Sequence, residues 1–252
     1  MLFFCDEIRK MHQSFKDFYQ FRSLASAHQY SKLYKLFNKY NTANKKILDW
    51  GCGNGHFSYY LCTKGYQVWS YSFENSLLIW ESSIKGKCHF IQGNHDEPVK
   101  LPFTDCFFDT VVSIGVLEHV RETQGNELKS LKEINKILKP DGLFICYHLP
   151  NYYSLIELFT RSFLPKKFHH QYRFTKKQII KMCIETGFEI LEIKQYGFLP
   201  RNFWNKAPKI LQQSLLITII WNALDSILYT LLSPICQNYY FIARKQQEHT
   251  KN

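Results

Sequence analysis

The stretch ILDWGCGNGHFS, residues 47–58, decides the fold. It starts as a short apolar run typical of a buried strand, ends that run at Asp49, and passes through three glycines into an apolar helix start. Glycine tolerates left-handed backbone angles, so glycines at alternate positions let a chain turn tightly with a ligand against it. We therefore expect a strand, a ligand-binding turn and a helix whose first amide groups face the ligand.

The glycine spacing indicates which kind of ligand this turn accepts. A dinucleotide-binding turn needs its third glycine at the position of His56, where the helix packs close to a pyrophosphate. Here the glycines follow the pattern G-x-G-x-G at Gly51, Gly53 and Gly55. The pattern disfavours a nicotinamide-dependent oxidoreductase, which shares the same kind of sheet and turn.

Short β-rich runs recur along the chain with helical stretches between them, which predicts βαβ units and a mostly parallel sheet. The runs expected to form strands are residues 46–50, 67–73, 89–92, 110–114, 143–148, 188–195 and 239–245. Helices are expected over about residues 6–40 and between a Thr175 cap and a Gly187 stop. In LKPDG, residues 138–142, a helix should end and a turn should precede the next strand.

Three further stretches extend the pattern: LPFTDCFFDTVVSIGVLEHV (101–120), LKEINKILKPDGLFICYHLPN (131–151) and GFEILEIKQYG (187–197). With the glycine turn, they resemble the class I methyltransferases that use S-adenosylmethionine (SAM), and within them the methyltransferase type 11 group. The resemblance implies an α/β fold with a doubly wound, seven-stranded, Rossmann-like sheet. The implied strand order is 3-2-1-4-5-7-6 with strand 7 antiparallel, and the implied cofactor is SAM.

The resemblance also implies residues that hold the methionine and ribose parts of SAM. Those around the methionine part are Gly51, Cys52, Gly53, Asn54 and Gly55, with Asp49 beneath them. The family's ribose-binding acid falls here on Ser72, next to Phe73. Glu74 is the alternative, because a carboxylate can accept two hydrogen bonds at once.

On the adenine side, the resemblance places Asn94 where its oxygen could accept a bond from the adenine amino group. His95 could pack on the ring, and Asp96 competes with Asn94 for the role. Ser113 and Ile114, at the end of the fourth strand, should offer backbone groups to the cofactor.

Methyl transfer is an in-line displacement, so the enzyme must mainly align the acceptor and exclude water. A base is needed only where the acceptor loses a proton, and histidine suits that task near neutral pH. His119 and His148 are the candidate bases, each with the alternative of lining the pocket. Tyr147, Glu118 and Tyr152 are weaker candidates.

Composition sets the broad class. With 252 residues, one domain with an elaboration is expected. The net charge of +11 favours an anionic partner or a merely basic surface. The eight cysteines lack the close pairing of a structural zinc site, so we expect reduced thiols and no metal. The amino terminus lacks a secretory signal pattern, which favours a cytoplasmic location.

The expected organisation has four parts: an N-terminal helical cap (1–44), a SAM-binding core (45–199), an apolar helical insertion (200–237), and a last strand with a tail (238–252). In the insertion, Ser214, Thr218, Asn222 and Ser226 make a narrow polar stripe along an otherwise apolar helix. A lid over the active site is the main interpretation of residues 210–232. Contact with the inner face of a membrane is the alternative, and it would favour a lipid-linked or glycan-linked acceptor.

The predicted function is SAM-dependent methylation of a small-molecule, glycan or lipid-linked acceptor on oxygen or carbon. The basic stretch 161–181 could bind phosphate or form a solvated helix face. RNA is an alternative acceptor, although no RNA-binding appendage is recognisable. A non-catalytic binding protein is a further alternative, prompted by Ser72. The sequence leaves the oligomeric state open.

Overall fold

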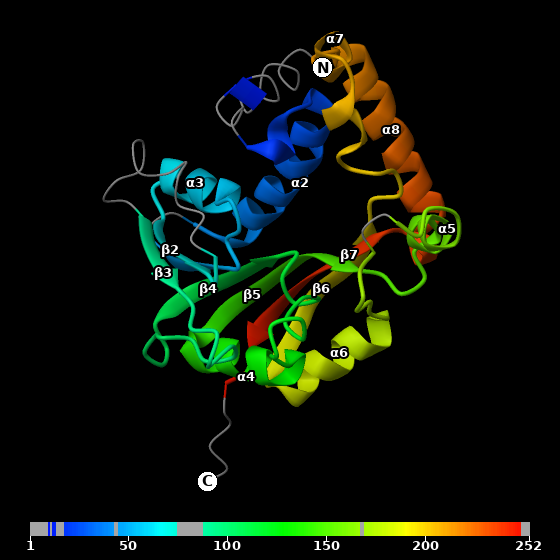
Figure 1. Cartoon of the computed structure of the whole chain (residues 1–252). Coiled ribbons are helices and arrows are strands. Elements are labelled where there is room, and N and C mark those ends of the chain that lie inside the picture. The colour runs from blue at the N-terminus through cyan, green and yellow to red at the C-terminus, as the bar shows by residue number, and fades with distance from the viewer. Residues whose placement is uncertain are drawn as a thin grey trace.

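A seven-stranded sheet forms the centre of the molecule (Figure 1). The computed structural model describes residues 10, 12–13, 18–42, 45–74, 88–166 and 169–247. The strands are β1 (Lys46–Trp50), β2 (Gln67–Ser72), β3 (Cys88–Gln92), β4 (Phe108–Ile114), β5 (Leu138–Pro150), β6 (Phe188–Tyr196) and β7 (Asn238–Lys245). Their order is β3-β2-β1-β4-β5-β7-β6, and β7 runs antiparallel to both of its neighbours. The predicted fold class, strand order and direction of the last strand are confirmed.

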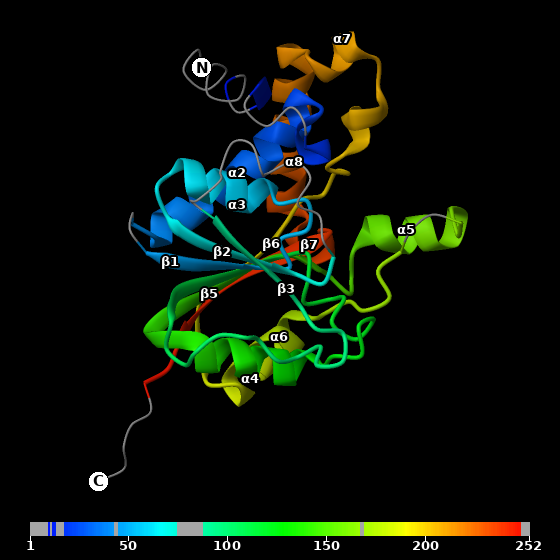
Figure 2. The same ribbon diagram turned by 60° about the vertical axis from the view of Figure 1, so that its left-hand side comes forward.

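Helices cover both faces of this sheet. The longer ones are α2 (Leu24–Tyr40), α3 (His56–Thr63), α4 (Glu127–Ile137), α5 (Leu155–Phe163), α6 (Lys176–Glu185) and α8 (Leu215–Leu231). The short ones are η1 (Tyr19–Phe21), η3 (Phe203–Lys206), α7 (Lys209–Gln212) and η4 (Ser233–Ile235). Helices α2, α3 and α8 lie on one side of the sheet, and α4 and α6 lie on the other (Figures 1 and 2). The result is the three-layered arrangement expected of a doubly wound fold.

Two apolar layers hold the sheet between the helices. On one side, Phe37 of α2 and Phe57 of α3 pack in the same buried cluster as Ile47 of β1. On the other side, Ile134 of α4 and Phe144 of β5 belong to a second buried cluster. Because the central strands are covered on both faces, their sequences are continuous apolar runs rather than alternating ones.

The stretch 138–142 differs from its predicted role. Helix α4 ends at Ile137 as expected, but Leu138 already pairs with Phe108, so β5 begins there rather than at Leu143. The predicted turn is instead an irregularity within β5, where Asp141 takes a φ of 59° and the register shifts. Residues 139–142 have no partner in β4, so this turn-forming sequence bulges out between two paired parts of β5.

The N-terminal region contains more than one helical segment, as predicted. Residues 10 and 12–13 are helical, and after η1 the helix α2 begins at Leu24, where the Ser23 side chain accepts a hydrogen bond of 3.2 Å from the Ser26 amide. Such a cap satisfies an otherwise unpaired amide at the helix start. Residues 1–9, 11 and 14–17 of the expected helical cap lie outside the described residues.

Helix α6 starts and stops where the sequence indicates. Thr175 and Gln178 form a reciprocal capping box, and Gly187 follows the helix with a φ of 77°. Seven of the eight cysteines are described, and none of the seven forms a disulfide. Five of them are buried, as expected for reduced thiols. Cys5 lies outside the described residues.

Helix α8 forms in the apolar insertion with its polar stripe turned inward. Thr218, Asn222 and Asp225 are 1%, 4% and 3% exposed, whereas Ile220 and Ile227 are each 57% exposed. The polar stripe faces α2, where the Asn222 amide reaches the Ala25 carbonyl oxygen at 3.5 Å. Within the described ranges, no helix is both long enough and apolar enough to cross a membrane.

Candidate active site

The glycine turn between β1 and α3 is built on left-handed backbone angles. Gly51, Gly53 and Gly55 have φ values of 75°, 52° and 79°. The Gly51 and Cys52 amides donate hydrogen bonds of 2.8 and 2.9 Å to the Tyr71 carbonyl oxygen, which ties the turn to β2. A Cβ atom on Gly51 would lie 2.3 Å from a Val116 methyl carbon, whereas one on Gly53 would meet none of the described atoms within 4 Å. The turn therefore leaves open space above Gly53.

Asp49 lies beneath this turn in a buried polar network. Its carboxylate accepts a 2.5 Å hydrogen bond from the Ser58 hydroxyl, which in turn accepts one of 2.7 Å from Ser70. Burial raises the pKa of Asp49 to about 6, although the hydrogen bond from Ser58 opposes the rise. The carboxylate thus anchors the start of α3 beneath the turn.

The N-terminal segment covers the glycine turn from the outside. The amide groups of Gln20 and Asn54 bond reciprocally, at 2.7 and 3.3 Å. The rings of Phe18 and Tyr59 lie 5.9 Å apart, and the Phe18 side chain is buried. Gln20 is a site residue that the sequence analysis missed, because nothing in the local pattern shows that residue 20 meets residue 54.

The ends of β2 and β3 bring together the residues predicted for ribose and adenine. The Ser72 hydroxyl accepts a hydrogen bond of 3.2 Å from the Glu74 amide. The Phe73 and His95 rings lie 4.9 Å apart, and the Asn94 side-chain oxygen accepts a 3.0 Å bond from the Asp96 amide. Asn94 and Asp96 therefore lie in one turn, and both stay candidates for the adenine side.

The end of β4 carries Ser113 and Ile114 and then Gly115, with a φ of 69°. Ser113 is fully buried. A Cβ atom on Gly115 would lie 3.6 Å from a Glu118 carboxylate oxygen and 3.9 Å from the Cβ atom of His148. Gly115 thus brings the ends of β4 and β5 close together.

Glu118 and His119 lie in the segment that follows β4. Glu118 is 3% exposed, and burial raises its pKa to about 7. His119 is one-third exposed, and its Nδ1 atom lies 3.0 Å from a Glu122 carboxylate oxygen. One ligand atom each from Glu118, His119 and His170 lie within 4.8 Å of one another, a spacing that could hold a cation.

His148, at the end of β5, is buried and has a left-handed φ of 69°. A side chain other than glycine rarely adopts this conformation, and such backbone strain is common at functional sites. Tyr196 of β6 bonds the His148 Nδ1 atom and also accepts a 2.9 Å hydrogen bond from the His148 amide. The Nε2 atom is buried with no hydrogen-bond partner among the described residues.

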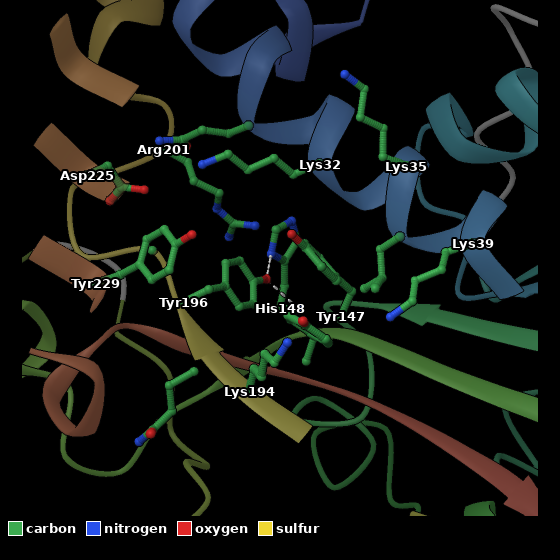
Figure 3. Close-up of a pocket in the computed structure, with 15 residues that line it drawn as sticks. Lys32, Lys35, Lys39, Tyr147, His148, Lys194, Tyr196, Arg201, Asp225 and Tyr229 are labelled. Atoms are coloured by element: carbon green, nitrogen blue, oxygen red, sulfur yellow. Dashed lines mark hydrogen bonds between the residues drawn. The ribbon is translucent and has the colours of Figure 1, made fainter. Parts of the chain in front are cut away.

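A cavity of about 490 Å³ opens beside His148, between α2, α8 and the ends of β5 and β6 (Figure 3). Its wall includes Tyr147, Tyr196 and Arg201 besides His148. Burial holds the pKa of His148 well below its usual value, and the positive charge of Arg201 adds to the effect. His148 is therefore neutral at physiological pH.

Known proteins share the family and the fold of this chain. A family model described as a methyltransferase domain matches residues 20–193. The chain belongs to the methyltransferase-domain family. An uncharacterized protein of Methanocaldococcus jannaschii is 33% identical over 186 residues, which is 72% of each chain. A ubiquinone biosynthesis O-methyltransferase of Rickettsia canadensis is 26% identical over 189 residues, 70% of this chain and 77% of that protein.

A solved SAM-dependent methyltransferase from Methanosarcina mazei has the same fold. It superposes with a TM-score of 0.59 at 19% identity, covering 84% of this chain and 98% of that one. These similarities confirm the prediction of a class I SAM-dependent methyltransferase, and they confirm SAM as its cofactor.

The shape and chemistry of the turn fit SAM. The open space at Gly53 accommodates a ligand that packs against backbone, and helix α3 points its first amides toward the same place. Asp49, Asn54 and the Phe73–His95 ring pair lie at the ends of neighbouring parallel strands, where this fold binds ligands. These residues are our candidates for holding the methionine, ribose and adenine parts.

Only the structure shows that three further residues of this methyltransferase lie at the candidate site. Arg201 lies in the loop after β6, Tyr196 ends β6, and Lys32 is on α2. Each comes from a segment distant from the glycine turn along the chain, so no spacing rule could link it to the cofactor. Of the weaker candidate bases, Tyr147 is buried in the cavity wall and Tyr152 is 49% exposed.

Proposed function

We propose that this methyltransferase methylates a hydroxyl group of a small-molecule acceptor bound in the cavity, with His148 as the general base. The observation that carries the proposal is the position of His148, which lines the cavity and also lies beside Gly115 at the end of β4. The related ubiquinone biosynthesis O-methyltransferase supports oxygen as the methylated atom.

A base at His148 would work through Nε2, since Tyr196 already engages Nδ1. The backbone amide of His148 can only donate, so the Tyr196 oxygen accepts that bond. If Nδ1 also carries a proton, the same oxygen accepts a second bond, and the Nε2 lone pair is left for the acceptor hydroxyl. The buried Nε2 atom then takes the hydroxyl proton as the oxygen becomes methylated.

The cofactor supplies an electrophilic methyl group on a sulfonium centre. What the chain itself contributes is alignment and exclusion of water. Tyr196 fixes the His148 ring, and α2 and α8 close the cavity above the ends of β5 and β6. In this proposal the insertion that contains α8 is part of the acceptor site and acts as its cover.

His119 is the weaker base in this proposal. Its Nδ1 atom is paired with Glu122, and one-third of its side chain is exposed to solvent. Proton transfer to a positioned base contributes roughly 10²–10⁴-fold to a rate. We therefore expect His148→Gln to lower the rate of methyl transfer by about that factor, and His119→Gln to lower it far less.

A screen with labelled SAM tests the proposal, using hydroxylated benzoates, free nucleosides and lipid-extracted quinols as acceptors. Isothermal titration with SAM, NADH and NADPH runs in parallel, and only SAM should bind. His148→Gln should retain SAM affinity within about twofold, because the residue acts on the acceptor. Equal loss of rate in His119→Gln and His148→Gln, or methylation of nucleosides alone, would refute the assignment.

The exposed face of α8 favours a second candidate, an acceptor presented at a lipid surface. Leu216, Ile220, Ile227 and Leu231 form an apolar stripe on the outside of the helix, and each is at least 57% exposed. Lys206 and Lys209 precede the helix. An apolar stripe beside cations is the pattern of helices that lie on anionic membrane surfaces.

A further inference from the structure

The cavity beside His148 has an unusual concentration of cations for a small-molecule site. Five basic side chains contribute to its wall, and they come from α2, β6 and the following loop: Lys32, Lys35, Lys39, Lys194 and Arg201. Of the described residues in the wall, Asp225 of α8 is the carboxylate. Cations confined in a partly dry cleft attract anions more strongly than the same charges do on an open surface.

Some of these charges are already neutralised. Lys39 and Lys194 lie 3.2 and 2.8 Å from the carboxylate of Glu192. The Asp225 carboxylate is hydrogen-bonded to the backbone: one of its oxygens accepts hydrogen bonds of 2.8 Å from the amides of both Phe198 and Leu199. Its main contact is therefore with the loop between β6 and η3.

Arg201 and Lys32 are cations of this wall that form no ion pair with a described carboxylate. Their contacts are weaker: Arg201 lies over the Tyr30 ring at 5.9 Å, and Lys32 donates a 3.5 Å hydrogen bond to the Ser226 hydroxyl. The Nη1 atom of Arg201 is buried and has no hydrogen-bond partner in the described part of the chain. Lys32 is half-buried, and burial lowers its pKa even though Asp225 partly compensates. A buried donor without a partner is costly, and an anionic ligand would satisfy it.

The two cations enter the cavity from opposite sides. Figure 3 shows the Arg201 guanidinium directed toward His148, and Lys32 extending from α2 toward Asp225 and Tyr229. The rest of the wall contains four tyrosines: Tyr147, Tyr196, Tyr229 and Tyr240. Such a site combines two cations with an aromatic lining, which suits a planar or apolar body with an acidic group.

We propose that the methyl acceptor is an anion whose carboxylate or phosphate group binds between Arg201 and Lys32 while its hydroxyl faces His148. This inference rests on the proposed function, because it places the acceptor in the same cavity. It also bears on the base. Burial is the main cause that lowers the pKa of His148, and the charge of Arg201 adds to it; an anion beside Arg201 offsets only this second contribution.

Direct binding of anions to the full-length chain tests the proposal without SAM. The probes are 3,4-dihydroxybenzoate, its uncharged methyl ester and inorganic phosphate, each titrated calorimetrically. The acid should bind at least tenfold more tightly than the ester, and Arg201→Gln should remove most of that difference. Lys209→Gln is the matched control, since Lys209 is an exposed cation on α7 outside the cavity wall, and it should change nothing.

The remaining outcomes decide between anion classes or overturn the proposal. Saturable binding of phosphate that Arg201→Gln weakens, with none for the benzoate, assigns a phosphorylated acceptor. Equal affinity for acid and ester, equal effects of Arg201→Gln and Lys209→Gln, or no saturable binding of either anion would overturn it. Lys32→Gln is a second variant in case Arg201→Gln fails to fold. These titrations contain no SAM. Their result therefore does not depend on whether the SAM-binding and His148 experiments succeed or fail.

Discussion

At the scale of single residues, Asp49 carries a cost that a purely structural residue would avoid. A pKa raised from 3.8 to about 6 means that the ionised carboxylate is destabilised by about 3 kcal/mol at neutral pH. Ser58 offsets only part of this cost through its 2.5 Å hydrogen bond. A charge retained at such a cost beneath a ligand-binding turn is typical of functional sites.

The raised pKa of Asp49 predicts how the free energy of unfolding depends on pH. An acid whose folded pKa lies above its unfolded pKa destabilises the protein above the folded value, and the penalty disappears as the pH falls from about 6 to 3.8. Asp49→Asn should therefore raise the free energy of unfolding by roughly 1–3 kcal/mol at pH 8 and by little near pH 4. Urea unfolding at both pH values measures the difference.

Asp109 provides a control of opposite sign for this experiment. Although burial raises its pKa, the hydrogen bonds from Lys139 and from the Lys46 amide outweigh burial and lower it. Asp109→Asn should thus lower stability at pH 8. A loss of stability in Asp49→Asn that is the same at both pH values would contradict the burial argument.

At the scale of elements, two glycines of the glycine turn have different roles, although the sequence pattern does not distinguish them. Gly51 is a packing residue, since any side chain would collide with Val116. Gly53 faces open space. Of these two glycines, Gly53 is therefore the one beside which we expect the cofactor.

We expect Gly53→Arg to abolish SAM binding while the protein remains folded. The new side chain would fill the open space, and a left-handed residue other than glycine adds strain of about 1–2 kcal/mol. Gly65→Arg is the matched control, because Gly65 has a φ of 82° with no described atom within 4 Å of an added Cβ, and it lies after α3. Titration calorimetry with SAM gives the affinity of each variant. Unchanged affinity in Gly53→Arg would exclude this turn as the site.

At the scale of the whole molecule, the helix of the insertion has the opposite orientation to an ordinary surface helix. Helix α8 packs its polar side chains on α2 and exposes its apolar ones. Scattered exposed apolar residues are ordinary, but a continuous stripe along one helix marks a surface that contacts something else. The proposed contact is an anionic lipid surface.

Flotation with vesicles of mixed phosphatidylcholine and phosphatidylserine tests this contact. The wild-type chain should float, and the double variant Ile220→Glu, Ile227→Glu should remain at the bottom with an unchanged melting temperature, because both side chains are exposed. Ile184→Glu is the control, since Ile184 is 64% exposed on α6, on the far side of the sheet. Failure of the wild-type chain to float would eliminate the membrane contact and leave α8 as a cover of the cavity.

The sequence by itself determined the architecture of this protein. Alternating strands and helices, the turn at Gly51–Gly55 and the cap and stop of α6 are local patterns, and the backbone obeys them because propensity and burial agree there. In the stretch 138–142 the predicted turn is present as a bulge within β5, and only the start of the strand differs, because Leu138 already pairs with β4 before the turn. The direction in which α8 presents its polar stripe was likewise decided by packing, since periodicity defines two faces without saying which of them is buried.

Only the tertiary structure decided the composition of the proposed acceptor cavity and of the candidate cofactor site. It joins His148 to Tyr196, brings Arg201 and Lys32 into the cavity wall, and covers Asn54 with Gln20. These residues lie far apart along the chain, and each is unremarkable in its local sequence. They come together because of the order of the strands and the packing of α2 and α8 over them. A local sequence pattern carries no information on such long-range contacts.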